Sequence, residues 1–158
     1  MQKRLLTVFA CMLVLSITSF AAPKKKATPG GPAPDKAYLE KLLAGWSAGD
    51  SASMAQYYAQ GDNLLFFDVI PLKYANWAEY QKGTADLLKN YKSFKLTLGD
   101  DAQVHQDGDV AWSAATIKED AVTSTGKHEM ATWRWSAVFQ KQDGKWLIVH
   151  EHTSAPLP

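Results

Sequence analysis

The fold of this 158-residue chain is decided by the stretch DGKWLIVHEHTSAP, residues 143–156. It opens on Asp143-Gly144, a strong signal for a tight hairpin turn. The residues that follow the turn have the length and apolar character of a β-strand. Strands joined by a tight turn run antiparallel, so this stretch predicts the last strand of an antiparallel sheet.

Further strands precede this hairpin, because apolar residues after position 92 recur with a period of about 2 instead of about 3.6. Apolar and polar residues alternate from 94 to 98, which indicates one strand. Turn residues then divide the rest of the chain into strands near 110–120 and 128–141 and the last strand, near 146–153. With a short apolar run at 64–68, we expect four long strands and a short one.

Three helices are expected before these strands. Asp35 can cap the first, which carries four large apolar residues on one face: Leu39, Leu42, Leu43 and Trp46. A second, short helix is expected between Gly49 and Gly61, and Asn76 with Glu79 has the form of a capping box for the third. Together, the expected helices and strands predict an α+β fold, with three N-terminal helices packed on one face of a curved antiparallel sheet. Such an arrangement leaves a concave pocket between its layers.

The N-terminus has the pattern of a signal peptide. A basic start is followed by an apolar run at 5–20, which is too short for a membrane-spanning helix, and by small residues that suit cleavage after Ala21. We therefore expect a signal peptide at 1–21, a Pro/Lys/Gly-rich linker at 22–34 and one domain at 35–158. The expected protein is exported, periplasmic or secreted, with no stable membrane insertion after the signal is removed. The single cysteine, Cys11, lies inside the apolar run, so the mature domain would have no disulfide.

The charge of the domain argues against nucleic acid as a partner. Five of the 17 Lys and Arg residues precede residue 35, which leaves 12 basic residues against 16 acidic ones. Affinity for phosphates depends on clustered Lys and Arg, and this domain is mildly acidic. The sequence also has no Walker loop, dinucleotide glycine fingerprint, serine nucleophile elbow or kinase motif, so we expect no cofactor.

Four segments carry a resemblance to a known family: residues 47–50 (SAGD), 58–62 (YAQGD), 67–68 (FD) and 143–156. They resemble the nuclear transport factor 2-like superfamily, in particular its SnoaL-like branch, and the last segment is similar to the end of the calcium/calmodulin-dependent kinase association domain. The resemblance implies a cone-shaped fold that encloses a pocket, and homodimers packed through the outer face of the sheet. Members of the superfamily include isomerases, cyclases, hydratases, binding proteins and assembly modules, so the fold does not settle the function.

Asp68 is the candidate catalytic residue. The ketosteroid isomerases of this superfamily hold a general-base Asp just after the first short strand, and Asp68 falls at the matching place. However, Leu42 and Trp135 stand where those enzymes carry their two oxyanion donors, so an enolate would lack both. Asp68 can equally cap a loop at the rim of the pocket.

The resemblance to the association domain bears on the charge of the ligand. That domain binds small carboxylates through three Arg, and the matching positions here are Ile117, Ala137 and Thr153. The absence of all three charges argues against an anionic ligand held in that way.

Alternate residues of the last strand must face opposite sides of the sheet. Similarity to the association domain directs Leu147, Val149, Glu151 and Thr153 toward the pocket, and assigns Trp146, Ile148, His150 and His152 to a dimer face. A single β-bulge would reverse this assignment. The full set of expected pocket residues is Trp46, Tyr57, Trp133, Trp135, Val149, Glu151 and Thr153.

Three of these strand residues have alternative interpretations. His150 and His152 could bind a metal from one strand face, but no third ligand is fixed by spacing, so we expect no metal site. Glu151 is either inside, where it must be paired or protonated, or at the rim, where it reaches solvent.

The sequence thus predicts an exported, dimeric domain that binds a small, largely apolar molecule. One alternative is an isomerase-like or cyclase-like enzyme with Asp68 as general base and Tyr57, Tyr58 or Glu151 as its proton partner. The other is an oligomeric assembly module whose pocket is incidental.

Overall fold

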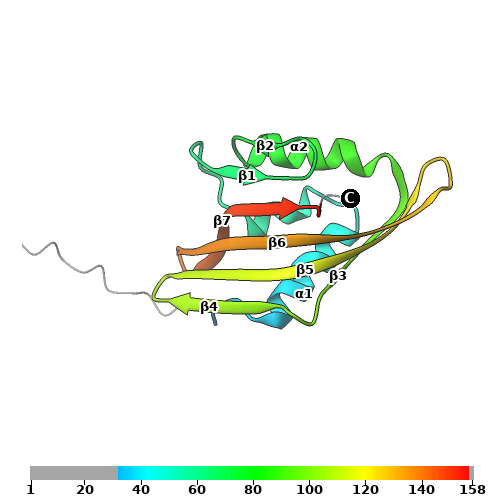
Figure 1. Ribbon diagram of the computed structural model, residues 1–158. Helices are drawn as coiled ribbons and strands as arrows, with labels where there is room; N and C mark the ends of the chain where they lie inside the picture. Colours follow the sequence, from blue (N-terminus) through cyan, green and yellow to red (C-terminus); the bar gives the residue numbers. More distant parts are fainter. Residues whose placement is uncertain (1–31, 157–158) are drawn as a thin grey trace, which may run out of the picture.

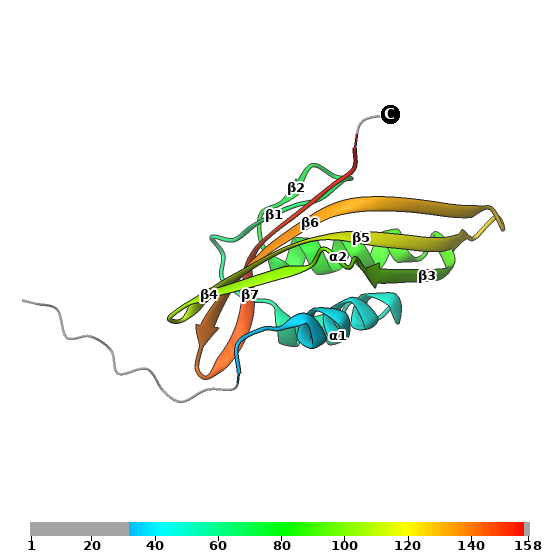
Figure 2. The same cartoon turned by 60° about the horizontal axis from the view of Figure 1, so that its bottom comes forward.

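The computed structural model describes residues 32–156, and the expected signal peptide and most of the expected linker lie outside this range. The elements follow in the order α1 Lys36–Ser47, η1 Ser53–Tyr57, β1 Leu65–Phe67, β2 Lys73–Tyr74, α2 Trp77–Leu88, β3 Tyr91–Leu98, β4 Gln103–Asp107, β5 Val110–Thr123, β6 His128–Gln142 and β7 Lys145–Ser154. The two α-helices lie on the same face of a curved sheet, which confirms the predicted α+β class (Figures 1 and 2).

The sheet is mixed, not wholly antiparallel as expected. Its strands are ordered β2-β1-β7-β6-β5-β3. The strand β5 is long enough to pair with β3 at residues 117–123 and with β4 at residues 110–114. The hairpin pairs β5–β6 and β6–β7 are antiparallel, as their tight turns require, but β1 runs parallel to β7. No tight turn connects β1 to β7, so the hairpin argument does not fix their relative direction. The short strands β2 and β4 were not predicted.

Both α-helices begin at the residues that the sequence indicates. The Asp35 side chain accepts a hydrogen bond of 2.8 Å from the Tyr38 backbone N–H at the start of α1. At the start of α2, Asn76 accepts one of 2.9 Å from the Glu79 N–H, while Glu79 accepts one of 2.8 Å from the Ala75 N–H. These contacts satisfy N–H groups that have no partner within the helix.

The expected second, short helix is the five-residue 3₁₀-helix η1, not an α-helix. Asp50 accepts hydrogen bonds from the backbone N–H groups of Ala52 and Ser53, which hold the chain in a tight turn just before it. At Tyr58 the backbone becomes extended and forms an isolated bridge with Ile148 on β7. The segment is therefore too short for an α-helix, and its end is fixed by the sheet.

A β-bulge in β7 changes which residues face the helices. Val138 pairs with His150 and Phe139 pairs with Ile148, so Val149 is the extra residue without a partner. Before the bulge, Trp146 and Ile148 are buried in the core, at 6% and 0% exposure. Their expected place on an outer dimer face is therefore wrong, because the single extra residue exchanges the two faces of the strand.

Beyond the bulge the predicted orientation holds. Glu151 and Thr153 are buried, His152 is exposed and His150 is half-buried.

The core itself lies between the helices and the sheet, and its largest fully buried side chains include Leu39, Met54, Tyr58 and Phe139. Within residues 32–156, no helix has the length and apolar character needed to cross a membrane.

Candidate functional site

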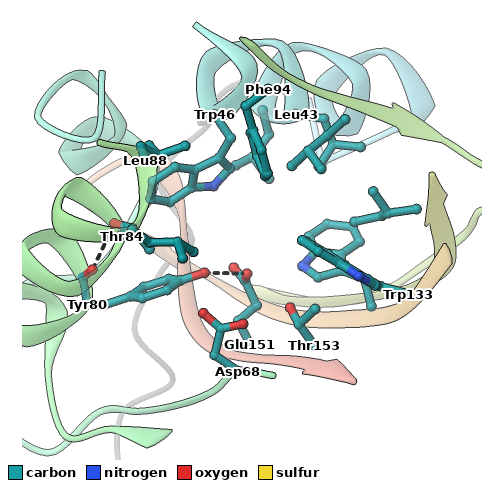
Figure 3. A pocket seen from close by; sticks show the side chains of 15 residues that line it. Leu43, Trp46, Asp68, Tyr80, Thr84, Leu88, Phe94, Trp133, Glu151 and Thr153 are labelled. Carbon is teal, nitrogen blue, oxygen red and sulfur yellow. Dashed lines mark hydrogen bonds between the residues drawn. The ribbon is translucent and has the colours of Figure 1, made fainter. Parts of the chain in front are cut away.

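A cavity of about 70 Å³ lies between the helices and the sheet. It is lined by 15 side chains from α1, α2, β3, β5, β6, β7 and the loop after β1 (Figure 3). Most of the wall is aliphatic or aromatic, including Leu42, Leu88, Phe94 and Ile117. The polar lining consists of three hydroxyl groups, from Thr84, Thr153 and Tyr80, and two carboxyl groups, from Asp68 and Glu151.

Glu151 is held inside this wall by two phenols. Its strand position pairs it with Ala137 on β6 and Phe66 on β1, and only 4% of the residue is exposed. Oε2 accepts a hydrogen bond of 2.6 Å from the Tyr58 hydroxyl, and Oε1 accepts one of 2.9 Å from the Tyr80 hydroxyl. Both carboxyl oxygens therefore have a donor, as a buried polar group requires.

The network continues to the first helix. The Trp46 indole N–H donates a hydrogen bond of 3.1 Å to the Tyr58 hydroxyl, which leaves that hydroxyl free to donate to Glu151. The rings are packed around it: Tyr58 stacks on Trp77, with centroids 4.5 Å apart. One buried network thus joins α1, the residue after η1, α2 and β7.

The environment raises the pKa of Glu151 to about 7. The largest cause is burial, which penalises the charged form, and the nearby charge of Asp68 adds to it. The Tyr58 and Tyr80 hydroxyls and the Trp135 indole act in the opposite direction, because they stabilise the carboxylate. Glu151 can therefore be either neutral or ionised near neutral pH.

Asp68 lies in the loop after β1, and its carboxyl group points toward the same space as that of Glu151 (Figure 3). Burial also raises the pKa of Asp68, while a hydrogen bond of 2.7 Å from the Val69 N–H opposes that increase. The charge of Asp68 in turn raises the pKa of Tyr80 and Glu151, so the three groups are electrostatically coupled. Such a set can hold a proton, transfer one or bind a positive charge.

Most of the residues expected at the pocket meet at this cavity. Those that line it are Trp46, Asp68, Trp133, Trp135, Glu151 and Thr153. Tyr57 does not: it is half-buried and packs edge-on against Tyr38, because the chain turns inward only at the next residue. Val149 is also absent from the wall, since it is the bulged residue of β7.

Two residues of this network are poorly indicated by the sequence: nothing in it points to Tyr80 at the cavity wall, and Tyr58 is expected only as an alternative proton partner. Both fall on apolar helical patterns, where an aromatic residue is more often part of the core. The available signal was Glu151 itself, because a buried carboxyl group requires hydrogen-bond donors.

The two histidines of β7 lie away from the cavity. The His150 ring donates a hydrogen bond of 2.7 Å from Nδ1 to the Leu65 carbonyl oxygen, and Phe67 packs edge-on against both His150 and His152. In the part of the chain that the structure describes, no three His, Cys, Asp or Glu side chains come together as metal ligands.

Solved structures with the same fold come from several bacteria. A nuclear transport factor 2-like superfamily protein from Salmonella enterica serovar Typhimurium is 21% identical, with a TM-score of 0.70, covering 78% of this chain and 92% of that one. A candidate association domain of calcium/calmodulin-dependent protein kinase II from Xanthomonas campestris is 22% identical, with a TM-score of 0.66 and coverage of 84% and 98%. A candidate scytalone dehydratase from Novosphingobium aromaticivorans is 7% identical, with a TM-score of 0.66 and coverage of 75% and 79%.

These similarities are to the fold, and the family comes from the sequence. Among curated proteins none matches this chain significantly. The family model of the SnoaL-like domain matches residues 36–158, which include every helix and strand described above. The chain therefore belongs to the SnoaL-like domain family and has the nuclear transport factor 2-like fold.

Proposed function

We propose that this chain is an exported SnoaL-like domain that binds a small, largely apolar molecule in the cavity between its helices and its sheet. The observation that carries the proposal is the composition of the cavity wall, which is apolar and aromatic except for a few convergent polar groups. Binding sites for small molecules have this composition, because apolar surface provides affinity and a few polar groups fix orientation.

The size of the cavity limits the ligand. A volume of about 70 Å³ is well below the about 300–1,000 Å³ of pockets for drug-sized ligands. Leu87, Leu88, Phe94 and Trp133 are only half-buried in the wall. We expect the ligand to be small, or to enlarge the cavity by displacing these side chains.

Export and dimerisation are part of the same proposal. Export rests on the signal-peptide pattern at 1–21. The dimer is proposed through the outer sheet face, which carries His150 and His152 and exposes 44% of Trp112 and 75% of Met130. The proposal of a dimer follows the family resemblance, and Trp112 and Met130 give this face apolar surface that a partner would cover.

The experiment is native mass spectrometry of residues 22–158, purified gently from the exporting host, beside the variant Thr153→Trp. Thr153 is a buried wall residue, so a larger side chain there occupies the cavity. We expect a dimer with a reproducible excess mass in the wild type and none in the variant. A wild type without excess mass, or an excess mass that persists in the folded variant, would contradict the proposal.

Catalysis is a second candidate function, favoured by the Asp68–Glu151 pair. Two carboxyl groups with raised pKa values line one cavity, and a group whose pKa lies near the working pH is suited to proton transfer. The similarly folded Novosphingobium protein is named a candidate dehydratase, which indicates one reaction class to assay. Asp68→Asn should abolish turnover of a substrate while its binding persists; unchanged turnover would exclude Asp68 as the base.

The assembly module remains the third candidate, since the Xanthomonas protein is named a candidate association domain. In that case His150→Ser with His152→Ser should change the oligomer size measured by light scattering, and Asp68→Asn should have no effect. Ligand binding without any change of assembly would argue against it.

A further inference from the structure

Among the residues that the structure describes, two acidic side chains and no basic one line the cavity. Asp68 and Glu151 both line it, and none of the lining residues in the described part of the chain is Lys, Arg or His. Neither carboxyl group belongs to any of the ion pairs formed within residues 32–156, which all lie elsewhere. An isolated carboxylate is costly to bury, and here burial raises the pKa of both groups.

Aromatic rings surround the same space. Trp46, Tyr80, Phe94, Trp133 and Trp135 belong to the wall. In Figure 3, Trp46 and Phe94 lie across the cavity from the carboxyl groups, Trp133 lies at one side and Tyr80 at the other. The rings are close neighbours: the Trp46 and Tyr80 centroids are 5.7 Å apart, and those of Phe94 and Trp133 are 6.4 Å apart. Aromatic rings attract cations, and cages of such rings bind alkylated ammonium groups.

We propose that the ligand is a small organic cation, whose alkylated ammonium group lies among these rings with its charge close to Glu151 and Asp68. This inference rests on the proposed function, because it requires that the cavity is a ligand site, and it names the class of ligand. An anion would be repelled by the two carboxylates. A neutral apolar molecule would contact the rings but would leave the two acidic groups uncompensated.

The hydrogen bonds of Glu151 favour an alkylated ammonium group over a primary amine or a metal ion. Tyr58 and Tyr80 already donate to both of its oxygens, so few acceptor positions remain for N–H groups. A fully alkylated ammonium group has no N–H to satisfy and presents apolar surface, which suits an apolar wall. Its interaction with Glu151 is then the attraction between charges, which a cavity of low polarity strengthens.

Cation binding would be coupled to the protonation of Glu151. The groups that face its carboxyl are Tyr58, Tyr80 on α2, Asp68 on the loop after β1 and the Trp135 indole. The two tyrosines stay neutral, since burial raises their pKa values well above the ordinary one. A bound cation favours the ionised form of Glu151, so its affinity should rise with pH through neutrality, and binding should release a proton.

The test uses two probes of the same shape. Choline and 3,3-dimethyl-1-butanol differ in the central atom of the head, which is a positively charged nitrogen in one and a neutral carbon in the other. Isothermal titration calorimetry of the wild type should show choline binding about tenfold more tightly or better. In Glu151→Gln the preference for choline should fall several-fold.

Glu119→Gln is the matched control. Glu119 is also buried, at 5% exposure, and burial raises its pKa, but it does not line the cavity. This variant should keep the preference for choline. If Glu151→Gln does not fold, as judged by circular dichroism, Asp68→Asn in the loop after β1 should still reduce the preference several-fold.

Three outcomes would overturn the inference: equal affinity of the wild type for both probes, tighter binding of the neutral alcohol, or no binding of choline. Loss of the preference in Glu119→Gln to the same extent as in Glu151→Gln would also overturn it. The proposed function fails on a different observation, the lack of any bound mass in the native protein. A neutral ligand found in the cavity would therefore refute the cation and leave the binding function intact.

Discussion

The Tyr58 hydroxyl donates a hydrogen bond of 2.6 Å to Glu151 Oε2, which joins two residues 93 positions apart in the sequence. The contact connects the segment after η1 to the last strand, at the centre of the network that holds the buried carboxyl group. It makes the position of Glu151 in the cavity wall a consequence of the fold.

Tyr58→Phe should destabilise the protein by about 1–3 kcal/mol, the usual cost of leaving buried polar groups without partners. The substitution removes a donor from Glu151 and the acceptor of the Trp46 indole N–H. The measurement is urea denaturation at pH 8, where Glu151 is mostly ionised. Tyr57→Phe is the control, because Tyr57 is half-buried and outside this network, and it should change the stability by less than about 0.5 kcal/mol. Equal losses in the two variants would contradict the role of the network.

The stability of the folded protein should fall as the pH rises from about 5 to 8. Folding raises the pKa of Glu151 from 4.5 to about 7, so in this interval the folded state binds more protons than the unfolded state. Its contribution is therefore complete at low pH and is lost as the pH rises through 7, with a size of up to about 3 kcal/mol. Urea denaturation at several pH values should show a clearly smaller slope for Glu151→Gln. The same slope in both proteins would place Glu151 in water.

Ile148→Ala and His152→Ala test the bulge in β7. Ile148 is fully buried and His152 is exposed. We expect a loss of about 2–5 kcal/mol for the first and less than about 0.5 kcal/mol for the second, measured by urea denaturation at equal protein concentrations. The reverse order would mean that the strand faces do not exchange at Val149.

Gly83→Ala should destabilise the protein although alanine favours helices by up to about 1 kcal/mol. A Cβ at Gly83 would clash with Cε1 of the Tyr74 ring, and that ring packs against Tyr80 with centroids 5.1 Å apart. Thermal denaturation should show a lower midpoint, with a cost of about 1–3 kcal/mol. Gly45→Ala is the comparison, because its Cβ would meet the flexible Met54 side chain, and its loss should be smaller. A higher midpoint for Gly83→Ala would refute this packing.

The helices, the hairpins and much of the cavity wall could be predicted from local patterns. Asp35 and Asn76 are caps that depend on residues three positions away, and the Asp143-Gly144 turn fixes the direction of β7. These signals are local, so the sequence alone displays them.

The remaining features depend on pairing between distant segments. The bulge at Val149 arises where β7 meets β6, and a period-2 pattern continued through it assigns Trp146 and Ile148 to the wrong face. The parallel pairing of β1 with β7 likewise joins residues 85 positions apart, such as Leu65 and His150. The role of Tyr80 required knowing that α2 passes over Glu151, which no local pattern in either segment indicates.

The most direct test of the cavity as the binding site is a ¹⁵N–¹H spectrum of the six tryptophan indole groups during titration with choline and with 3,3-dimethyl-1-butanol. Trp46, Trp133 and Trp135 line the cavity, whereas Trp77, Trp112 and Trp146 do not, so the protein contains its own controls. Binding in the cavity predicts shifts of the first three signals that saturate with one of the two probes, with small or no changes in the others. Shifts confined to Trp112 on the outer sheet face, or no saturable shift of the three cavity signals with either probe, would contradict it.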